Sequence, residues 1–93
     1  MTDSKPFSGR TALVTGASRG IGAATARHLA NLGTTVVLAA RTTDQIETLA
    51  REIEAGGGTA LAIGCDVSRS QEVRVLIDTA LARTGRLDLL VNN

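Results

Sequence analysis

The chain has 93 residues, 43% of them hydrophobic and only 1% aromatic, and a formal net charge of +1. A length below the usual ~100 to 150 residues of a domain excludes a second domain, and the shortage of aromatic residues favours a core of buried parallel strands. The ten basic residues are scattered among nine acidic ones, which excludes the basic stripe of a nucleic-acid-binding protein.

The sequence also argues against export and membrane insertion. Its single cysteine, Cys65, has no partner for an internal disulfide, and residues 1–10 lack the apolar stretch of a signal peptide. The longest apolar run, Val36 to Ala40, is far shorter than the ~20 residues that cross a bilayer. We therefore predict a cytoplasmic protein that does not enter a membrane, and we find no residue spacing typical of a metal site.

The first half of the chain predicts two strands around one helix. A polar lead-in over residues 1–9, expected to be mobile, precedes a strand at Thr11–Thr15. A helix at Gly20–Leu32 follows, with Gly33 at its end, and the second strand is Thr35–Ala40. At 3.6-residue spacing the buried face of this helix is predicted to hold Ile21, Ala24, His28, Leu29 and Leu32.

The second helix begins at a predicted capping box formed by Thr42 and Gln45, and Gly56 to Gly58 end it. Its predicted buried stripe is Ile46, Leu49, Ala50 and Ile53. A third strand at Thr59–Gly64 follows this helix.

A second predicted capping box, Ser68 with Gln71, opens the third helix, and Gly85 ends it. The buried stripe of this helix is predicted to hold Val73, Leu76, Ile77, Ala80 and Leu81. The fourth strand is expected at Leu87–Val91.

Four strands alternating with three helices predict an α/β fold: a Rossmann-like, doubly wound parallel sheet with strand order 3-2-1-4. The first two helices would cover one face of the sheet and the third helix the other. The ligand crevice would lie between strands one and four. Leu89, Leu90 and Val91 would be exposed at a free sheet edge, so residues 1–93 are interpreted as the N-terminal part of one dinucleotide-binding domain with an incomplete sheet.

The loop between the first strand and the first helix has the spacing G-x-x-x-G-x-G. Gly16 permits a sharp turn, Gly20 lets the backbone approach an anion, and Gly22 allows helix and strand to lie close together. Free amides and the positive end of the helix dipole favour a pyrophosphate here. A tight turn with a closely packed helix would use the same glycines, but the flanking strand and helix favour a nucleotide site at Gly16, Ser18, Arg19, Gly20, Ile21 and Gly22.

Three motifs, in this order, resemble the short-chain dehydrogenase/reductase family: the glycine loop at 15–22, Cys65-Asp66-Val67 and Leu90-Val91-Asn92-Asn93. The resemblance spans nearly the whole chain. It implies that the Asp66 carboxylate accepts a hydrogen bond from the adenine amino group, with the Val67 backbone beside it. It also implies that Asn92 and Asn93 begin an Asn-Asn-Ala-Gly motif that supports the sheet and the cofactor. Asp66 could instead cap the following helix, but Ser68 offers a better-placed capping box.

Ala40 and Arg41 occupy the end of the second strand, where an NAD enzyme places a carboxylate on the ribose hydroxyls. The alanine removes a group that would repel a 2′-phosphate, while Arg41 offers a fork of donors and Arg19 could reach the same group. The sequence therefore favours NADP(H) over NAD(H). The alternative is that both arginines are solvent-facing surface residues.

Two further residues are expected to have only packing roles. Cys65 is interpreted as a small buried hydrophobe, because its sequence neighbourhood offers no second cysteine and no basic residue that would stabilise a thiolate. His28, the only histidine, is interpreted as a packing residue of the first helix rather than a general base.

The resembled family transfers hydride with a Tyr-x-x-x-Lys pair and a serine after a fifth strand. The chain has no tyrosine and only one lysine, Lys5, so we assign no catalytic residue. We interpret the chain as the N-terminal portion of a longer NADP(H)-dependent oxidoreductase acting on a carbonyl or alcohol substrate, with a homo-oligomeric parent. The alternatives are a free-standing, non-catalytic nucleotide-binding module and a partly folded fragment whose motifs are relics.

Overall fold

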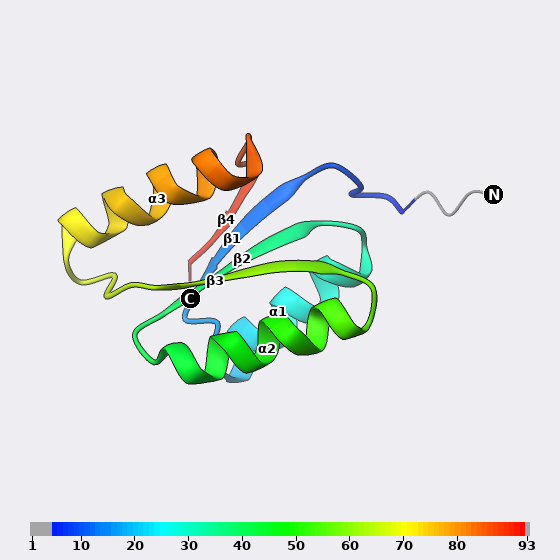
Figure 1. The fold of residues 1–93 in the computed structure, drawn as a ribbon, viewed down its shortest axis with the longest axis horizontal. Helices are drawn as coiled ribbons and strands as arrows, with labels where there is room; N and C mark the ends of the chain where they lie inside the picture. The colour runs from blue at the N-terminus through cyan, green and yellow to red at the C-terminus, as the bar shows by residue number, and fades with distance from the viewer. Residues whose placement is uncertain (1–4, 93) are drawn as a thin grey trace.

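A computed structural model describes residues 5–92 of the chain. These residues form a parallel four-stranded sheet with the strand order β3-β2-β1-β4, and three helices lie on it (Figure 1). The elements are β1 Thr11–Thr15, α1 Gly20–Asn31, β2 Thr35–Ala40, α2 Thr43–Ala55, β3 Thr59–Gly64, α3 Ser70–Thr84 and β4 Leu89–Val91. The doubly wound arrangement predicted from the sequence is confirmed.

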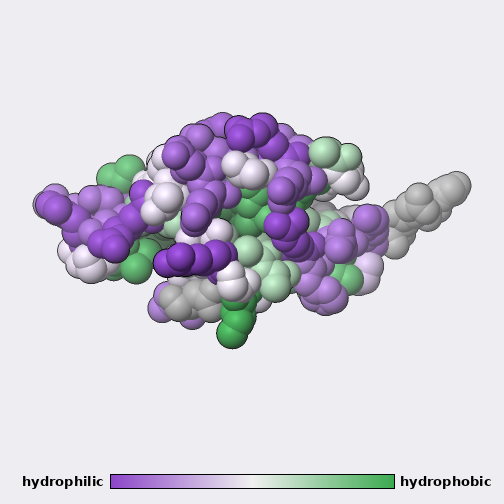
Figure 2. Space-filling model, turned by 90° about the horizontal axis from the view of Figure 1, so that it is seen from below, coloured by the Kyte–Doolittle hydropathy of each residue, from purple (hydrophilic) through white to green (hydrophobic). Residues whose placement is uncertain are grey.

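The helices divide between the two faces of the sheet as predicted, with α1 and α2 on one face and α3 on the other (Figure 1). Successive strand residues point to opposite faces, so Val36 and Leu38 join the α1/α2 cluster while Val37 and Ala39 join the α3 cluster. The outer surface of the α1/α2 layer is largely hydrophilic, with a hydrophobic strip between the polar side chains (Figure 2).

The buried face of α1 differs from the prediction. The helix buries four residues of mostly small volume: Gly22, Ala26, Leu29 and Ala30. Of the predicted face, Ile21, Ala24 and His28 are exposed, and α1 ends at Asn31, one residue earlier than expected. The prediction followed the larger side chains, whereas small ones let the helix axis approach the sheet closely and therefore face it.

The predicted stripe of α2 is confirmed, since Ile46, Leu49, Ala50 and Ile53 are its buried residues. On α3, Leu76 and Ala80 are buried, but Leu81 is 42% exposed, contrary to prediction. Successive residues of a helix are rotated by about 100° around its axis, so Leu81 lies on a different side of α3 from Leu76 and Ala80.

Neither predicted capping box forms. The residue before α2 is Thr42 and the residue before α3 is Arg69, and neither makes a side-chain capping hydrogen bond. Ser68 lies too early to cap α3, which begins at Ser70. Its hydroxyl instead donates to the carboxylate of Asp66 at 2.7 Å, because a short side chain in a turn finds local partners more readily than helical amides further along.

The fourth strand is shorter than predicted. Thr11 donates its N–H to Asp88 Oδ2 at 2.8 Å, and the Asp88 N–H donates to the Thr11 carbonyl at 2.9 Å, so a side chain replaces one rung of the ladder before β4 begins. Leu89 and Leu90 are 44% and 56% exposed, as expected for a free edge. Val91 is instead partly buried against the α1/α2 cluster.

Part of the lead-in lies against the amino end of the sheet. Residues 6–9 form a turn, in which the Phe7 N–H donates to the Leu32 carbonyl at 2.9 Å and the Arg10 N–H donates to the Phe7 carbonyl at 3.1 Å. The prediction for residues 1–4 lies outside the described residues. Within residues 5–92 the structure has no helix with the length and apolar character needed to span a bilayer.

Candidate functional site

The loop after β1 places backbone amides at the start of α1. Gly16 and Gly20 both adopt positive φ, at +62° and +63°, which a residue with a Cβ adopts only at a cost. The Ala17 N–H donates to the Ala39 carbonyl at 3.2 Å, which ties the loop to the end of β2. The first turn of α1 therefore begins at the carboxyl edge of the sheet, with its positive dipole end toward that edge.

A hollow of about 400 Å³ lies over the ends of β1, β2 and β3. Three segments far apart in the sequence line it: Gly16, Ser18, Arg19, Ala40, Arg41, Thr42, Cys65, Asp66, Val67 and Ser68. Six of the ten predicted site residues meet here. Gly20, Ile21 and Gly22 lie beside this lining at the start of α1, and Asn93 lies outside the described residues.

The position of this hollow differs from the expected crevice between β1 and β4, because its lining includes no residue of β4. The ends of β1 and β4 are joined instead, since Thr15 Oγ1 donates to Asn92 Oδ1 at 3.0 Å. The hollow thus lies at the carboxyl ends of parallel strands, on the β2 and β3 side of the point where the strand order reverses. Ligands of open α/β sheets bind at this edge.

Asp66 forms a tight turn directly after β3. Its Oδ1 accepts hydrogen bonds from the Ser68 N–H at 3.0 Å and from the Ser68 hydroxyl at 2.7 Å. These bonds, together with the positive charges of Arg41 and Arg69, hold the pKa of the Asp66 carboxyl below its ordinary value. The side chain is therefore an anionic acceptor at neutral pH, and its bonds close a turn before α3 rather than cap the helix.

Arg19 and Arg41 bring two positive charges to the hollow. Both are exposed, and they come from the loops after β1 and β2. Exposure alone also fits the solvent-facing alternative, but both arginines line one concave surface beside the first turn of α1. Such an arrangement suits a ligand with more than one phosphate.

Two polar residues of the lining were not predicted as site residues. Thr42 follows Arg41 directly, and Ser68 was interpreted only as a helix cap. The Asp-x-Ser spacing of residues 66–68 is a signal for an Asx turn, and it predicts the Asp66–Ser68 pairing better than the capping-box pattern did.

Cys65 and His28 were both predicted to have packing roles, and the structure confirms this for Cys65 only. Cys65 is 4% exposed in the α3 cluster, confirming its interpretation as a buried residue. Burial, followed by the charges of Glu72 and Asp66, raises the pKa of its thiol, which keeps the thiol protonated and unreactive. His28 is exposed on α1, so the predicted packing role was wrong.

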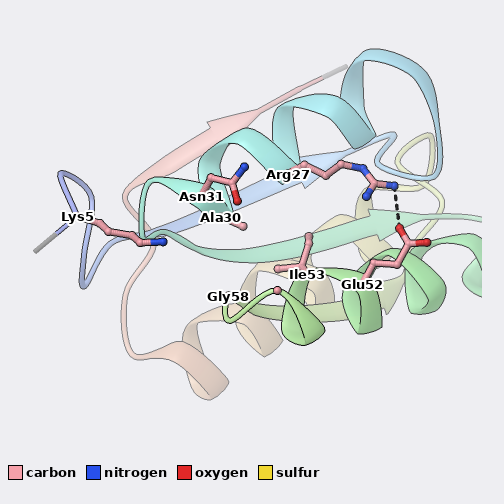
Figure 3. A pocket seen from close by; sticks show the side chains of 8 residues that line it. Lys5, Arg27, Ala30, Asn31, Glu52, Ile53 and Gly58 are labelled. Carbon is pink, nitrogen blue, oxygen red and sulfur yellow. Dashed lines mark ion pairs between the residues drawn. The ribbon is translucent and has the colours of Figure 1, made fainter. Parts of the chain in front are cut away.

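A second concavity, drawn in Figure 3, lies between α1 and α2 toward their C-terminal ends. Lys5, Asn31 and Ile53 are among the residues that line it. Arg27 points across it to Glu52, and the two form an ion pair at 2.8 Å (Figure 3). No predicted site residue lines this concavity, and the pairing of Arg27 with Glu52 makes it a weaker candidate for an anionic ligand.

The sequence model of the short chain dehydrogenase family matches residues 10–93. Among curated proteins, the chain is 44% identical over 88 residues to an uncharacterized oxidoreductase of Mycobacterium tuberculosis, covering 91% of this chain and 26% of that protein. It is 47% identical over 81 residues to the short-chain reductase protein NovJ of Streptomyces niveus, covering 87% of the chain and 31% of NovJ. The chain thus spans between a quarter and a third of these relatives.

Solved structures of similar fold include proteins bound to a nicotinamide dinucleotide. A metagenomic short-chain oxidoreductase in complex with NADP has a TM-score of 0.90 and 50% identity, covering 94% of this chain and 39% of that one. An actinorhodin polyketide ketoreductase variant with NADPH has a TM-score of 0.86 and 38% identity, covering 90% of this chain and 32% of that one.

Proposed function

The chain belongs to the short-chain dehydrogenase family, and from this premise we propose that it binds NADP(H) in the hollow at the carboxyl edge of its sheet. The observation that carries the proposal is the meeting of Arg19, Arg41 and Asp66 in one concave surface beside the first turn of α1. The NADP and NADPH complexes among the similar structures support the choice of ligand.

The described residues fit the parts of this dinucleotide. Gly20 leaves open space, since a Cβ built there meets no other atom within 4 Å, so an anion has room to reach the amides that begin α1. We assign the diphosphate to the loop at Gly16–Gly22, the 2′-phosphate to Arg41 with Arg19, and the adenine amino group to the carboxylate of Asp66. The Val67 backbone and Asn93 complete the proposed contacts.

We further propose that this chain corresponds to the cofactor-binding, N-terminal part of a larger oxidoreductase, because it covers only 26% and 31% of the two curated relatives described above. NADP(H), when bound, supplies or accepts the hydride that interconverts a carbonyl and an alcohol. The residues of the chain would bind and orient it, and none of them is assigned to catalysis. Family analogy supports a homo-oligomeric parent, and the single unpaired cysteine supports a cytoplasmic setting.

Titration of the chain with NADPH and with NADH tests the cofactor assignment. The chain has no tyrosine or tryptophan, so the fluorescence of the reduced nicotinamide can be followed without interference from the protein. We expect NADPH to bind about tenfold or more tightly than NADH, because a charged hydrogen bond to the 2′-phosphate contributes about 1.5 to 3 kcal/mol.

Arg41→Asp is expected to weaken NADPH binding by about tenfold or more without weakening NADH binding, because NADH has no 2′-phosphate and its ribose hydroxyls can donate to a carboxylate. Arg74→Asp makes the same change of charge on the exposed surface of α3 and is the matched control. Equal NADPH affinities for the two variants would remove Arg41 from the site. Absence of NADPH binding to the folded wild-type chain would overturn the proposed function itself.

A further inference from the structure

Glu72 binds the backbone of a turn that lines the hollow. From the first turn of α3 its Oε1 accepts the N–H of Asp66 at 2.8 Å. Glu72 is not among the residues that line the hollow, whereas Asp66, Val67 and Ser68 are. The carboxylate therefore acts on the backbone of the lining turn without itself lining the hollow.

Two of the groups that hold Asp66 act on its N–H and on its carboxylate. Its N–H is bound by Glu72 and its carboxylate is bound by Ser68. The preceding residue is also fixed, because the Cys65 N–H donates to the Ala40 carbonyl at 3.0 Å. Of these anchors, the bond to Glu72 is the one that links the turn to α3 through a side chain.

The carboxylate of Glu72 is itself oriented. Its Oε2 lies 3.5 Å from Arg69 Nε, while the Arg69 N–H donates to the Asp66 carbonyl at 3.0 Å. Asp66, Arg69 and Glu72 thus form a closed ring of contacts around the turn. A side chain restrained in this way transmits the position of the helix to the turn more firmly than a freely rotating one.

The charge of Glu72 has the wrong sign to help an anionic ligand directly. A carboxylate near a phosphate-binding surface lowers affinity by Coulomb repulsion, and the negative charge of Glu72 does reach the lining, since it contributes to raising the pKa of the Cys65 thiol. A favourable effect of Glu72 on binding must therefore come from its hydrogen bond. This opposition makes the two contributions separable by substitution.

We propose that Glu72 is a positioning residue that holds the Asp66–Ser68 turn in the conformation that presents the Asp66 carboxylate to the adenine of the bound nucleotide. The expected effect of Glu72 on nucleotide affinity rests on the proposed nucleotide function. The structural role of the hydrogen bond between Glu72 and the Asp66 N–H does not depend on that function, because it can be measured without a ligand.

Two conservative variants separate hydrogen bonding from charge. Glu72→Gln keeps a carbonyl oxygen at the same reach and removes the charge, whereas Glu72→Asp keeps the charge and withdraws the acceptor by one methylene. Each is titrated with NADPH and with adenosine 2′,5′-bisphosphate, which keeps the adenine, the ribose, the 2′-phosphate and the 5′-phosphate and lacks the nicotinamide half. Glu54→Gln, an exposed site near the far end of α2, is the control for loss of one negative charge.

We expect Glu72→Asp to weaken both probes about fivefold, and Glu72→Gln to bind them within about twofold of the wild-type chain. If Glu72 acted through its charge, the order would be reversed, with Glu72→Gln binding more tightly and Glu72→Asp unchanged. That result, or equal affinities for all the variants, would overturn the proposal.

Amide hydrogen exchange at Asp66 provides the readout that needs no ligand. Exchange is expected to be faster in Glu72→Asp and to remain slow in Glu72→Gln, with circular dichroism confirming that both variants are folded. If the wild-type chain bound neither probe, the proposed function would fail while this exchange pattern still supported the role of Glu72. Unchanged exchange at Asp66 in Glu72→Asp would overturn that role whatever the titrations gave.

Discussion

The two ends of the sheet use the same backbone conformation for opposite purposes. At the carboxyl end, Gly20 has a φ of +63° and a Cβ built on it would meet no atom within 4 Å. At the amino end, Gly33 has a φ of +98° and its Cβ would lie 2.9 Å from Lys5 Cβ and 3.1 Å from the Ser8 N. A left-handed glycine thus makes room for the protein itself at one end and leaves open space at the other.

The arginines also differ between the two ends of the sheet. Toward the amino end, Arg27 is paired with Glu52 at 2.8 Å, and Arg86 Nε donates to Asp88 Oδ2 at 2.8 Å. At the carboxyl end, Arg19 and Arg41 face the hollow. Arg27 and Arg86 thus have carboxylate partners within the protein, whereas Arg19 and Arg41 line the hollow beside the first turn of α1, which is the arrangement expected where a phosphorylated ligand binds.

The largest effect that would test this comparison is on stability at the amino end. Gly33→Ala should lower the free energy of unfolding by about 3 kcal/mol, because left-handed strain adds to the displacement of the Lys5–Arg10 segment. Gly57 has a similar φ of +95° with nothing within 4 Å of a built Cβ. Gly57→Ala should therefore cost only the strain, about 1 kcal/mol.

Urea denaturation followed by circular dichroism measures both values. Equal losses for Gly33→Ala and Gly57→Ala would show that the lead-in segment does not press on Gly33 in solution. The difference between the two ends of the sheet would then disappear.

A smaller effect, divided between stability and binding, is expected at the carboxyl end. Gly20→Ala should cost about 1 kcal/mol of stability through strain and weaken NADPH binding about tenfold, because its methyl group enters the space proposed for the diphosphate. Gly57→Ala carries a comparable strain away from the hollow and should bind NADPH like the wild-type chain. If the two variants bound NADPH equally, Gly20 would not face the ligand.

The smallest expected effect concerns acid sensitivity. Hydrogen bonds from Arg86 and from the Thr11 N–H lower the pKa of Asp88. A carboxyl group with a lowered native pKa stabilises the fold above its ordinary pKa, and the stabilisation is lost as the pH falls through the lowered value. Asp88→Asn should therefore be less stable than the wild-type chain at neutral pH, and the gap between their thermal midpoints should narrow on acidification.

Asp66, at the carboxyl end of the sheet, also has a lowered pKa. The wild-type chain and Asp88→Asn should therefore both lose some stability in acid. Asp78→Asn, on the exposed surface of α3, serves as the control. A gap between the wild-type chain and Asp88→Asn that did not change with pH would show that the Asp88 charge contributes nothing at the junction of β1 and β4.

The quality of the sequence predictions depended on the size of the side chains involved. The stripe of α2 is made of large apolar residues spaced among charged ones, and it was predicted in full. On α1 the contact with the sheet is made mainly by alanine and glycine, whose weak hydrophobic signal was outweighed by Ile21 and His28. A helix face made of small residues, which lets the helix lie close to the sheet but buries little apolar area, is hard to recognise from hydrophobic periodicity.

The candidate site shows a related contrast. Arg41 was predicted from its place directly after the second strand, because strand ends meet at one edge of a parallel sheet. Asp66 was predicted from the resemblance of Cys65-Asp66-Val67, which follows the third strand, to a family motif. Glu72 was not predicted, because its partner is a backbone N–H six residues away and sequence patterns for turns and caps describe shorter reaches.

The sequence by itself determined the alternation of strands and helices, their order in the sheet and the edge at which Gly16, Arg41 and Asp66 meet, because hydrophobic periodicity, glycine positions and the handedness of βαβ connections are local or general rules. The tertiary structure decided which face of α1 is buried, how Asp88 replaces a rung of the β1–β4 ladder and how Glu72 fixes the turn at Asp66. Those outcomes depend on distances between side chains and backbone atoms of different elements, which exist only once the elements have packed together.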